Sequence, residues 1–543
     1  MRIYILYNSY KIQIKYETRK GSSALYWLRS DQTSDGTHPM LITNNKFTYT
    51  RTIFPCQDSP SVRFTYTAEI SVPKDLNFVA ICGINSKQII NVGDRNKHIF
   101  FEIMPMPSYA IIIIVGLLEK ITLLPHQDNI TLWVEKKYIK RSKKTFANFS
   151  NLLSIAKTLC GHHSKEYNIC VLPPNIPEIE LQCLSMIFVS SMLLNEHFFI
   201  LSSTVAQKVA QSWAGGLVTC TNFEHLWLIK SFSTIISREI IHRMYDEHIF
   251  RYEMSFLERK TINDLKIKIS LYGTDSQQRL VPNLNDILSK DITKYVPDEI
   301  GYFLLKCLQH YLGPKIFEQY LKSYMNKFYL KSINTNDWII HLYSHFFNQR
   351  KQINSILSTW FYGLDLTRIH KIYPHLFYQI ENQCCLLAEQ WITTEISNKL
   401  YPLLAKLKFY NNLERMEFLT YLYASPTILP IAKLKWLHFM LPLQDQTFQN
   451  RCLLLLLYIK NKWLEMVYPA LEFTRECCVP TFVCSIFRDL YELEEARHLA
   501  ISGFTVIVEK KCKMLPQTIE EVASILKINL KDICILNEKL FCM

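Results

Sequence analysis

The chain has few glycines and none of the glycine-rich motifs that hold a phosphate group or expose a serine nucleophile. Only 13 of its 543 residues are glycine, about a third of the usual ~7%. Loops that approach a ligand closely favour glycine because it has no side chain to collide with it. The sequence also lacks a Gly-x-Ser-x-Gly elbow, a phosphate-binding loop and a papain-type cysteine signature. These absences argue against an elaborate active site of any of these classes.

Paired cysteines with the spacing of a zinc knuckle or a redox motif are also missing. The 16 cysteines include the adjacent pairs Cys384–Cys385 and Cys477–Cys478, but no Cys-x-x-Cys. Residues 1–4 do not resemble the start of a signal peptide. We therefore expect reduced thiols in a cytoplasmic protein.

No apolar run is long enough to cross a membrane. The longest runs are 110–115, extended by Leu117 and Leu118, and 453–457, whereas a membrane helix needs about 20 residues. The sequence predicts no membrane span.

Positive charge is in excess but is concentrated in only one short segment. The net charge is +13, and the densest basic run is 136–144. Such a run is typical of a solvated surface, with a polyanion contact or a nuclear signal as the alternative. A nucleic-acid partner is not expected, because it would favour a longer basic stripe.

The pattern of apolar residues changes along the chain. Up to about residue 118, apolar and polar residues alternate, as in 12–16 and 63–70, which predicts β-strands. From about residue 150 the period becomes helical, as in 201–213 and 228–242. Successive helical stretches fill residues 380–543, which favours a solenoid or superhelical bundle.

Three segments carry a family resemblance. They are Phe54–Val62, Leu172–Pro174 and Gln207–Thr219, supported by Trp391–Thr393 and Phe487–Leu490. With them, the sequence resembles the leukotriene A4 hydrolase and aminopeptidase B branch of the M1 zinc aminopeptidases. The resemblance runs in order from about residue 10 to about residue 530.

The resemblance implies an α+β multidomain fold. It predicts an N-terminal β saddle domain over 1–118, a mostly helical thermolysin-like domain over 119–365 and a C-terminal α-helical solenoid over 375–543. The β domain of the family is longer, so we expect a shortened, truncated version here.

The zinc motif of the family is replaced at each of its positions. Family members bind zinc with two histidines in His-Glu-x-x-His and a glutamate on the next helix. The ligand positions are here Gln207, Gln211 and Lys230, and the general-base position is Lys208. An amide is a poor zinc ligand, and a protonated amine is none. The resemblance therefore predicts that zinc, the cofactor of active relatives, is not bound.

Other positions that the resemblance assigns to catalysis or substrate binding also differ. Gln182 replaces the glutamate that holds the substrate's amino terminus, and Asp298 replaces the tyrosine that stabilises the intermediate. Val479 and Thr481 align with the arginine and lysine that anchor substrate carboxylates, and Lys46 aligns with a glutamine of the amino-terminal subsite. The framework remains, including Trp213, Trp227, Pro297 and Gly301.

These replacements predict a fold kept without its chemistry. At the matching positions of an active relative, zinc and three glutamates have a net charge of −1. Here Lys208, Lys230 and neutral Gln182 have a net charge of +2, so the site should repel the ammonium group of a peptide. We predict a catalytically inactive family member that binds an unknown protein or peptide, with the helical domain and the interdomain cleft as candidate surfaces.

Alternatives remain open at this stage. One is a hydrolase or aminopeptidase with unorthodox ligands, and another is a decoy that binds peptides without cutting them. Lys208 and Lys230 are expected to extend to solvent; the alternatives are a small anion bound between them and catalysis by one of them with a lowered pKa. Gln207 and Gln211 are expected to bond to each other or to water.

Overall fold

The structure is a computed structural model of the chain. It describes residues 2–6, 9–19, 21–22, 24–45, 47–81, 84–85, 88–124, 129–161, 166–177, 179, 184–195, 198–245, 254, 257–258, 280–285, 292, 298–361, 381–395, 400–509 and 513–529. Within these ranges no helix combines the length and the apolar character that crossing a bilayer requires.

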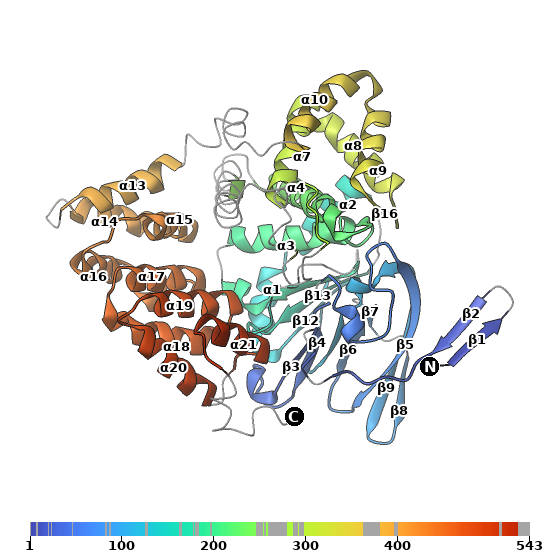
Figure 1. Cartoon of the computed structure of the whole chain (residues 1–543), viewed down its shortest axis with the longest axis horizontal. Helices are drawn as coiled ribbons and strands as arrows, with labels where there is room; N and C mark the ends of the chain where they lie inside the picture. Colours follow the sequence, from blue (N-terminus) through green and yellow to red (C-terminus); the bar gives the residue numbers. More distant parts are fainter. Residues whose placement is uncertain are drawn as a thin grey trace.

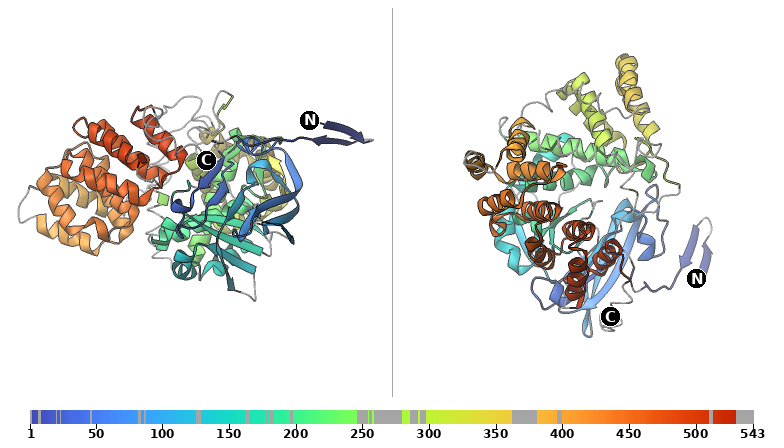
Figure 2. Two further views of the ribbon diagram at one scale, coloured as in Figure 1. Left: turned by 90° about the horizontal axis from the view of Figure 1, so that it is seen from below. Right: turned by 60° about the vertical axis from the view of Figure 1, so that its left-hand side comes forward.

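The N-terminal part is built from antiparallel sheets (Figure 1). One sheet has five strands in the order β3 (Leu25–Leu28), β4 (Met40–Thr43), β10 (Ile113–Gly116), β6 (Phe78–Ile81) and β7 (Ile84–Asn85). A second has three, in the order β5 (Arg63–Pro73), β9 (Arg95–Pro107) and β8 (Gln88–Val92). A separate hairpin, β1 (Arg2–Leu6) with β2 (Ser9–Gln13), projects from the body in both views of Figure 2. The predicted β domain is thus confirmed.

The middle part combines a small sheet with helices. In the sheet, β12 (Asn129–Val134), β13 (Glu166–Leu172) and β14 (Met186–Ser190) are parallel, and β11 (Glu119–Leu124) pairs with β12 in the antiparallel sense. The helices α1 (Ile139–Thr145) and α2 (Phe149–Cys160) lie between β12 and β13 in the chain. After β14 come α3 (Phe198–Trp213), α4 (Leu226–Met244), α7 (Asp298–Leu312), α8 (Pro314–Lys327), α9 (Thr335–His345) and α10 (Arg350–Phe361). Two short strands, β15 (Thr219–Cys220) and β16 (Ser332–Ile333), pair in parallel.

The C-terminal part is a stack of helices. They are α13 (Glu381–Thr393), α14 (Leu400–Phe409), α15 (Asn412–Ala424), α16 (Ile431–Met440), α17 (Phe448–Lys460), α18 (Val467–Cys477), α19 (Pro480–Glu492), α20 (Arg497–Glu509) and α21 (Pro516–Ile525). The odd-numbered helices from α13 to α21 form a row in which α13 packs against α15, α15 against α17, α17 against α19 and α19 against α21 (Figures 1 and 2). This arrangement is the one expected of a solenoid. The predicted domain boundaries stay predictions, and the one at 365–375 lies outside the described residues.

Local signals in the sequence explain where several helices begin. Asn411 precedes α15, and its side chain accepts hydrogen bonds from the backbone N–H groups of Leu413 and Glu414. The Glu414 carboxylate accepts in return from the N–H of Asn411 at 2.7 Å. This capping box satisfies donors that the first turn leaves without partners. At α19, Pro480 occupies the first turn, where no backbone N–H is needed.

Two hydrophobic cores hold the chain together, and a small polar junction joins them. One core covers the N-terminal and middle parts and also takes in Leu413, Met416 and Leu515 of the C-terminal part, and the other covers the helical stack. At the junction, the Gln32 side chain donates to the carbonyl of Met514 at 2.9 Å. The Asn175 side chain donates to the carbonyl of Lys513 at 3.0 Å and to that of Gln32 at 3.3 Å. The three parts of the chain therefore meet at one point.

His341 of α9 is a buried histidine among aromatic rings. Its ring centroid lies 5.5 Å from that of Tyr320 and 5.3 Å from that of Phe328. Burial, with smaller contributions from the positive groups His345 and Lys327, lowers the pKa of His341 from 6.5 to about 4. The ring is therefore neutral in the folded chain at neutral pH.

This pKa predicts a loss of stability in mild acid. Between pH 6.5 and about 4, His341 is protonated in the unfolded chain but not in the folded chain. The free energy by which neutral His341 favours the folded state is therefore complete above pH 6.5 and is lost as the pH falls towards 4. From pH 7 to 4.5 we expect the wild-type free energy of unfolding to fall by about 1–3 kcal/mol more than that of His341→Phe. Urea titrations of both proteins measure this difference, and equal losses would contradict it.

Candidate functional site at helices α3 and α4

The helices α3 and α4 carry the positions that the resemblance assigns to zinc ligands, and the framework residues of the resemblance hold these helices in place. Trp213 of α3 donates its indole N–H to the carbonyl of Gly161 at 3.1 Å. Trp227 of α4 donates to the Thr335 hydroxyl at 3.0 Å. Gly301 of α7 is needed for close packing, because a Cβ there would lie 2.1 Å from the Ser231 hydroxyl oxygen. The fourth framework residue, Pro297, lies outside the described residues.

The N-terminal part fixes the turn that follows α3. Arg63 Nη2 donates to the carbonyls of Leu217 at 2.7 Å and Gly216 at 3.1 Å. The hydroxyl of buried Tyr109 donates to the carbonyl of Gly215 at 2.8 Å. The β domain therefore positions the segment in which the family motif ends.

Gln207 connects α3 to α4 through both ends of its amide. Its Nε2 donates to the Ser233 hydroxyl at 2.9 Å and lies 3.4 Å from the Thr234 hydroxyl oxygen. Its Oε1 accepts from the Ser237 hydroxyl at 2.7 Å. The predicted bond between Gln207 and Gln211 is therefore wrong, because the Gln207 amide bonds to hydroxyl groups of α4 instead. The sequence signal for this contact is a set of four hydroxyl residues between positions 231 and 237 of α4, three of which meet Gln207.

Lys208 is buried instead of reaching solvent. It is only 3% exposed, and its Nζ donates to the carbonyl of Ile179 at 2.8 Å. The prediction of an extended, solvated Lys208 is wrong, because its neighbours Ser212, Val209 and others on α3 are buried on nearly every side of the helix. Ile179 is the first residue of the segment, ending at Cys183, that the resemblance aligns with the family's exopeptidase motif and that contains Gln182.

The other two ligand positions differ from each other. Gln211 is 6% exposed, and its Oε1 is buried without a hydrogen-bond partner among the described residues. Lys230 of α4 is half-buried. The carbonyl of Lys230 accepts from the hydroxyls of Ser233 at 2.8 Å and Thr234 at 2.9 Å. The same hydroxyls that meet Gln207 are thus oriented by the α4 backbone.

These side chains do not fit a zinc ion. The Gln207 oxygen already accepts a hydrogen bond from Ser237, and Lys208 places an ammonium group where the general base would be. Amide and ammonium groups compete poorly with imidazole and carboxylate for zinc. In the part of the chain that is described, no three His, Cys, Asp or Glu side chains gather closely enough to hold a metal ion.

The remaining predicted positions are scattered. Asp298 is the first residue of α7, but its side chain is not described, and Lys46 and Gln182 lie outside the described residues. Val479 is half-buried directly before α19, and Thr481 is exposed in the first turn of that helix. Neither of these two can anchor a carboxylate by charge.

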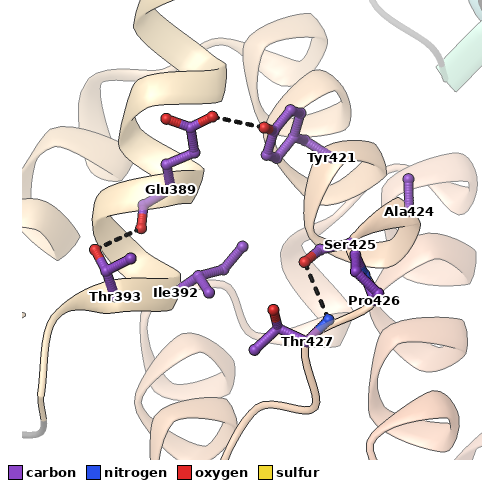
Figure 3. Close-up of a pocket in the computed structure, with 8 residues that line it drawn as sticks. All are labelled: Glu389, Ile392, Thr393, Tyr421, Ala424, Ser425, Pro426 and Thr427. Atoms are coloured by element: carbon purple, nitrogen blue, oxygen red, sulfur yellow. Dashed lines mark hydrogen bonds between the residues drawn. The ribbon is translucent and has the colours of Figure 1, made fainter.

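The helical stack contains a pocket of about 370 Å³ (Figure 3). It lies between the ends of α13 and α15, and Figure 3 shows Glu389 and Tyr421 facing each other across it. The Tyr421 hydroxyl donates to the Glu389 carboxylate at 2.8 Å. The pocket is lined by Glu389, Ile392, Thr393, Tyr421, Ala424, Ser425, Pro426 and Thr427.

Two lysines support the helix ends that border this pocket. Lys433 of α16 is 4% exposed and donates to the carbonyls of Trp391 and Ile392, both at 2.8 Å. Lys460 of α17 donates to the carbonyls of Tyr423 and Ser425. An ammonium group at a helix C-terminus is favourable because carbonyls there lack helical partners. The walls of the pocket are therefore fixed.

Comparison with known proteins identifies the family that the chain matches. Residues 180–360 match the Peptidase family M1 domain, and residues 4–110 match the Peptidase M1 N-terminal domain. Leukotriene A-4 hydrolase of Xenopus laevis is 30% identical over 501 residues, which cover 91% of this chain and 80% of that protein. Leucine aminopeptidase 2 of Saccharomyces cerevisiae is 27% identical over 391 residues, which cover 71% of this chain and 56% of that protein.

A solved structure confirms the fold. The structure of yeast LTA4 hydrolase in complex with bestatin superimposes with a TM-score of 0.77. The match covers 94% of this chain and 81% of that chain, at 24% sequence identity. The β domain, the middle domain and the helical domain thus occur in the same arrangement in both proteins.

Proposed function

The chain belongs to peptidase family M1, and we propose that it is a member without zinc chemistry whose function is to bind a protein or a peptide. The observation that carries this proposal is the Gln207 amide, which contacts hydroxyl groups of α4 through both its nitrogen and its oxygen. A metal ligand has been replaced by a hydrogen-bonded contact between the same two helices. The fold is retained while the chemistry is given up.

Charge supports the same proposal. Lys208 and Lys230 stand where a general base and a zinc-binding glutamate act in active relatives, so the site is positive. Two like charges about 6 Å apart at an effective dielectric near 20 repel each other by roughly 3 kcal/mol. The ammonium group of a peptide is disfavoured there for the same reason as a metal cation. A small anion near the two lysines is the ligand that this charge favours.

The helical domain is the proposed binding region. It offers the pocket between α13 and α15, whose walls are fixed by Lys433 and Lys460. Pockets of roughly 300 Å³ or more with a few polar groups are typical ligand sites. We place the protein in the cytoplasm, on the composition of the sequence alone.

An enzymatic function is the competing proposal, and only family membership supports it. We expect no turnover of aminoacyl fluorogenic substrates, either as purified or after addition of zinc, because the positions that the resemblance assigns to the zinc ligands and the general base carry amides and amines. The same assay on the protein after heat inactivation is the background. Turnover that rises in proportion to protein concentration and is abolished by a chelator would contradict the proposal.

A decoy that captures peptides without cutting them is a variant of the binding function. Calorimetric titration with short peptides should then give a saturable signal, and the Glu389→Gln variant shows whether the pocket of the helical domain takes part. A titration without a binding signal would exclude the peptide decoy and leave a protein as the proposed partner.

A further inference from the structure

The outer face of α16 is apolar and open to solvent. Leu434 and Leu437 are fully buried, whereas Ile431 is 42% exposed, Trp436 45% and Phe439 73%. The rings of Trp436 and Phe439 meet edge to face, with their centroids 6.4 Å apart. Positions 431, 435, 436 and 439 are three or four residues apart and so share one side of the helix. Adjacent exposed aromatic side chains of this kind point to an interaction site.

Neighbouring segments extend this face. Helix α14 packs against α16, and both helices lie on the left-hand side of the molecule in Figure 1. The last residue of α14 is Phe409, which is 88% exposed, and Ile428 in the turn before α16 is 59% exposed. We define the outer patch as these apolar residues together with the exposed lysines of the two helices: Lys406, Lys408, Phe409, Ile428, Ile431, Lys435, Trp436 and Phe439.

The charges of the outer patch are all positive. Helices α14 and α16 contain no aspartate or glutamate, and Lys406, Lys408 and Lys435 form no ion pair within the described part of the chain. After α14 the next carboxylate along the chain is that of Glu414, which caps α15, and after α16 it is that of Asp445. The patch therefore complements an anionic surface, and the net charge of +13 adds attraction at long range.

We propose that the outer patch binds the surface of a membrane that contains anionic lipid, with α16 lying in the plane of the headgroups. Helices that bind in this way place aromatic side chains at the boundary of the apolar layer and lysines among the phosphates. The stem of a lysine is apolar, so its ammonium group can reach a phosphate while the stem stays beside the rings. The proposal goes beyond the binding of a protein or a peptide and does not depend on it.

A bilayer fits the outer patch better than an acidic protein segment does. A partner helix is usually received in a groove, but Phe409 and Phe439 are 88% and 73% exposed and so stand out from the surface. Such side chains can enter a soft interface without a matching cavity. Because only one face of a ten-residue helix would be covered, we expect reversible binding, with half of the protein bound at on the order of 0.1 mM lipid.

Co-sedimentation of the full chain with vesicles tests the proposal. Vesicles of phosphatidylcholine with about 30% phosphatidylserine should bind the protein, and vesicles of phosphatidylcholine alone should bind it at least about tenfold more weakly. Raising the salt concentration from about 0.05 to about 0.5 M should weaken binding to the anionic vesicles, because salt screens the lysines. Equal binding to both kinds of vesicle would overturn the proposal.

Two variants with matched controls locate the contact. Phe439→Ser should weaken binding at least about fivefold. Its control, Phe347→Ser, changes an equally exposed phenylalanine (74%) in the short helix η9 (Phe347–Gln349) and should leave binding unchanged. Lys435→Glu should weaken binding at least about tenfold. Its control, Lys351→Glu on α10, changes another exposed lysine and alters the net charge equally, but should affect binding much less. Circular dichroism confirms that each variant is folded.

The remaining outcomes separate a membrane from a protein partner. A chain that does not bind anionic vesicles, or binding that Phe439→Ser and Lys435→Glu leave unchanged, overturns the proposal. Soluble polyglutamate is the probe for an acidic protein segment. Saturable binding of polyglutamate that Lys435→Glu abolishes, without binding to vesicles, would assign the outer patch to a protein partner and likewise overturn the proposal.

Discussion

The variant that carries Gln207→His, Lys208→Glu, Gln211→His and Lys230→Glu is expected to bind about one equivalent of zinc and to hydrolyse no peptide. Residues 207 and 211 are one turn apart on α3, so two imidazoles there share one face. A glutamate at position 230 of α4 supplies the third ligand, and the same four changes remove both cations from the site.

Zinc should return without activity because other positions remain changed. The resemblance assigns Asp298 to the position of the family's tyrosine and Gln182 to that of the glutamate that holds the substrate's amino terminus. Elemental analysis gives the zinc content, and aminoacyl fluorogenic substrates give the turnover. The variant that keeps Lys230 is the control, and it should bind zinc much more weakly. If the quadruple variant is folded but metal-free, the assignment of the ligand positions is wrong.

Lys208→Glu alone is expected to destabilise the protein by about 3–5 kcal/mol, although it restores the residue of active relatives. Lys208 is 3% exposed and donates to the carbonyl of Ile179. A carboxylate in its place would be buried facing another acceptor, without a metal ion to balance its charge. Urea unfolding at pH 7 measures the loss.

The matched variant Lys208→Met separates charge from shape. Methionine fills a similar space and buries no charge, but it leaves the carbonyl of Ile179 without this donor, so we expect a smaller cost of about 1–2 kcal/mol. Burial raises the pKa of a carboxyl group, and a protonated glutamate can donate to the carbonyl. The loss in Lys208→Glu should therefore shrink at pH 5. A Lys208→Glu protein as stable as wild type at pH 7 would contradict this account of the site.

Much of the fold could be predicted from the sequence because it depends on periodic patterns. Alternation in 63–70 predicted the first eight residues of β5, and the helical period in 201–213 and 228–242 predicted most of α3 and α4. The order of the family motifs then placed these elements in three domains. Such patterns persist when individual site residues change.

Contacts between elements could not be predicted in the same way. The hydroxyls that meet Gln207 come from Ser233 and Ser237, 26 and 30 residues away, and the contact depends on how α3 and α4 are rotated against each other. Lys208 was predicted to reach solvent because lysine usually does, but α3 is enclosed on nearly every side. The sequence also did not predict that Phe101 and Ile103 of β9 are exposed.

Elemental analysis of the wild-type chain, purified without a chelator and then supplied with excess zinc and dialysed, is the most direct test of the claim that this family member has no metal site. The account predicts that less than about a tenth of an equivalent is retained. Retention of close to one equivalent, lost when Gln207 or Gln211 is replaced by alanine, would contradict it.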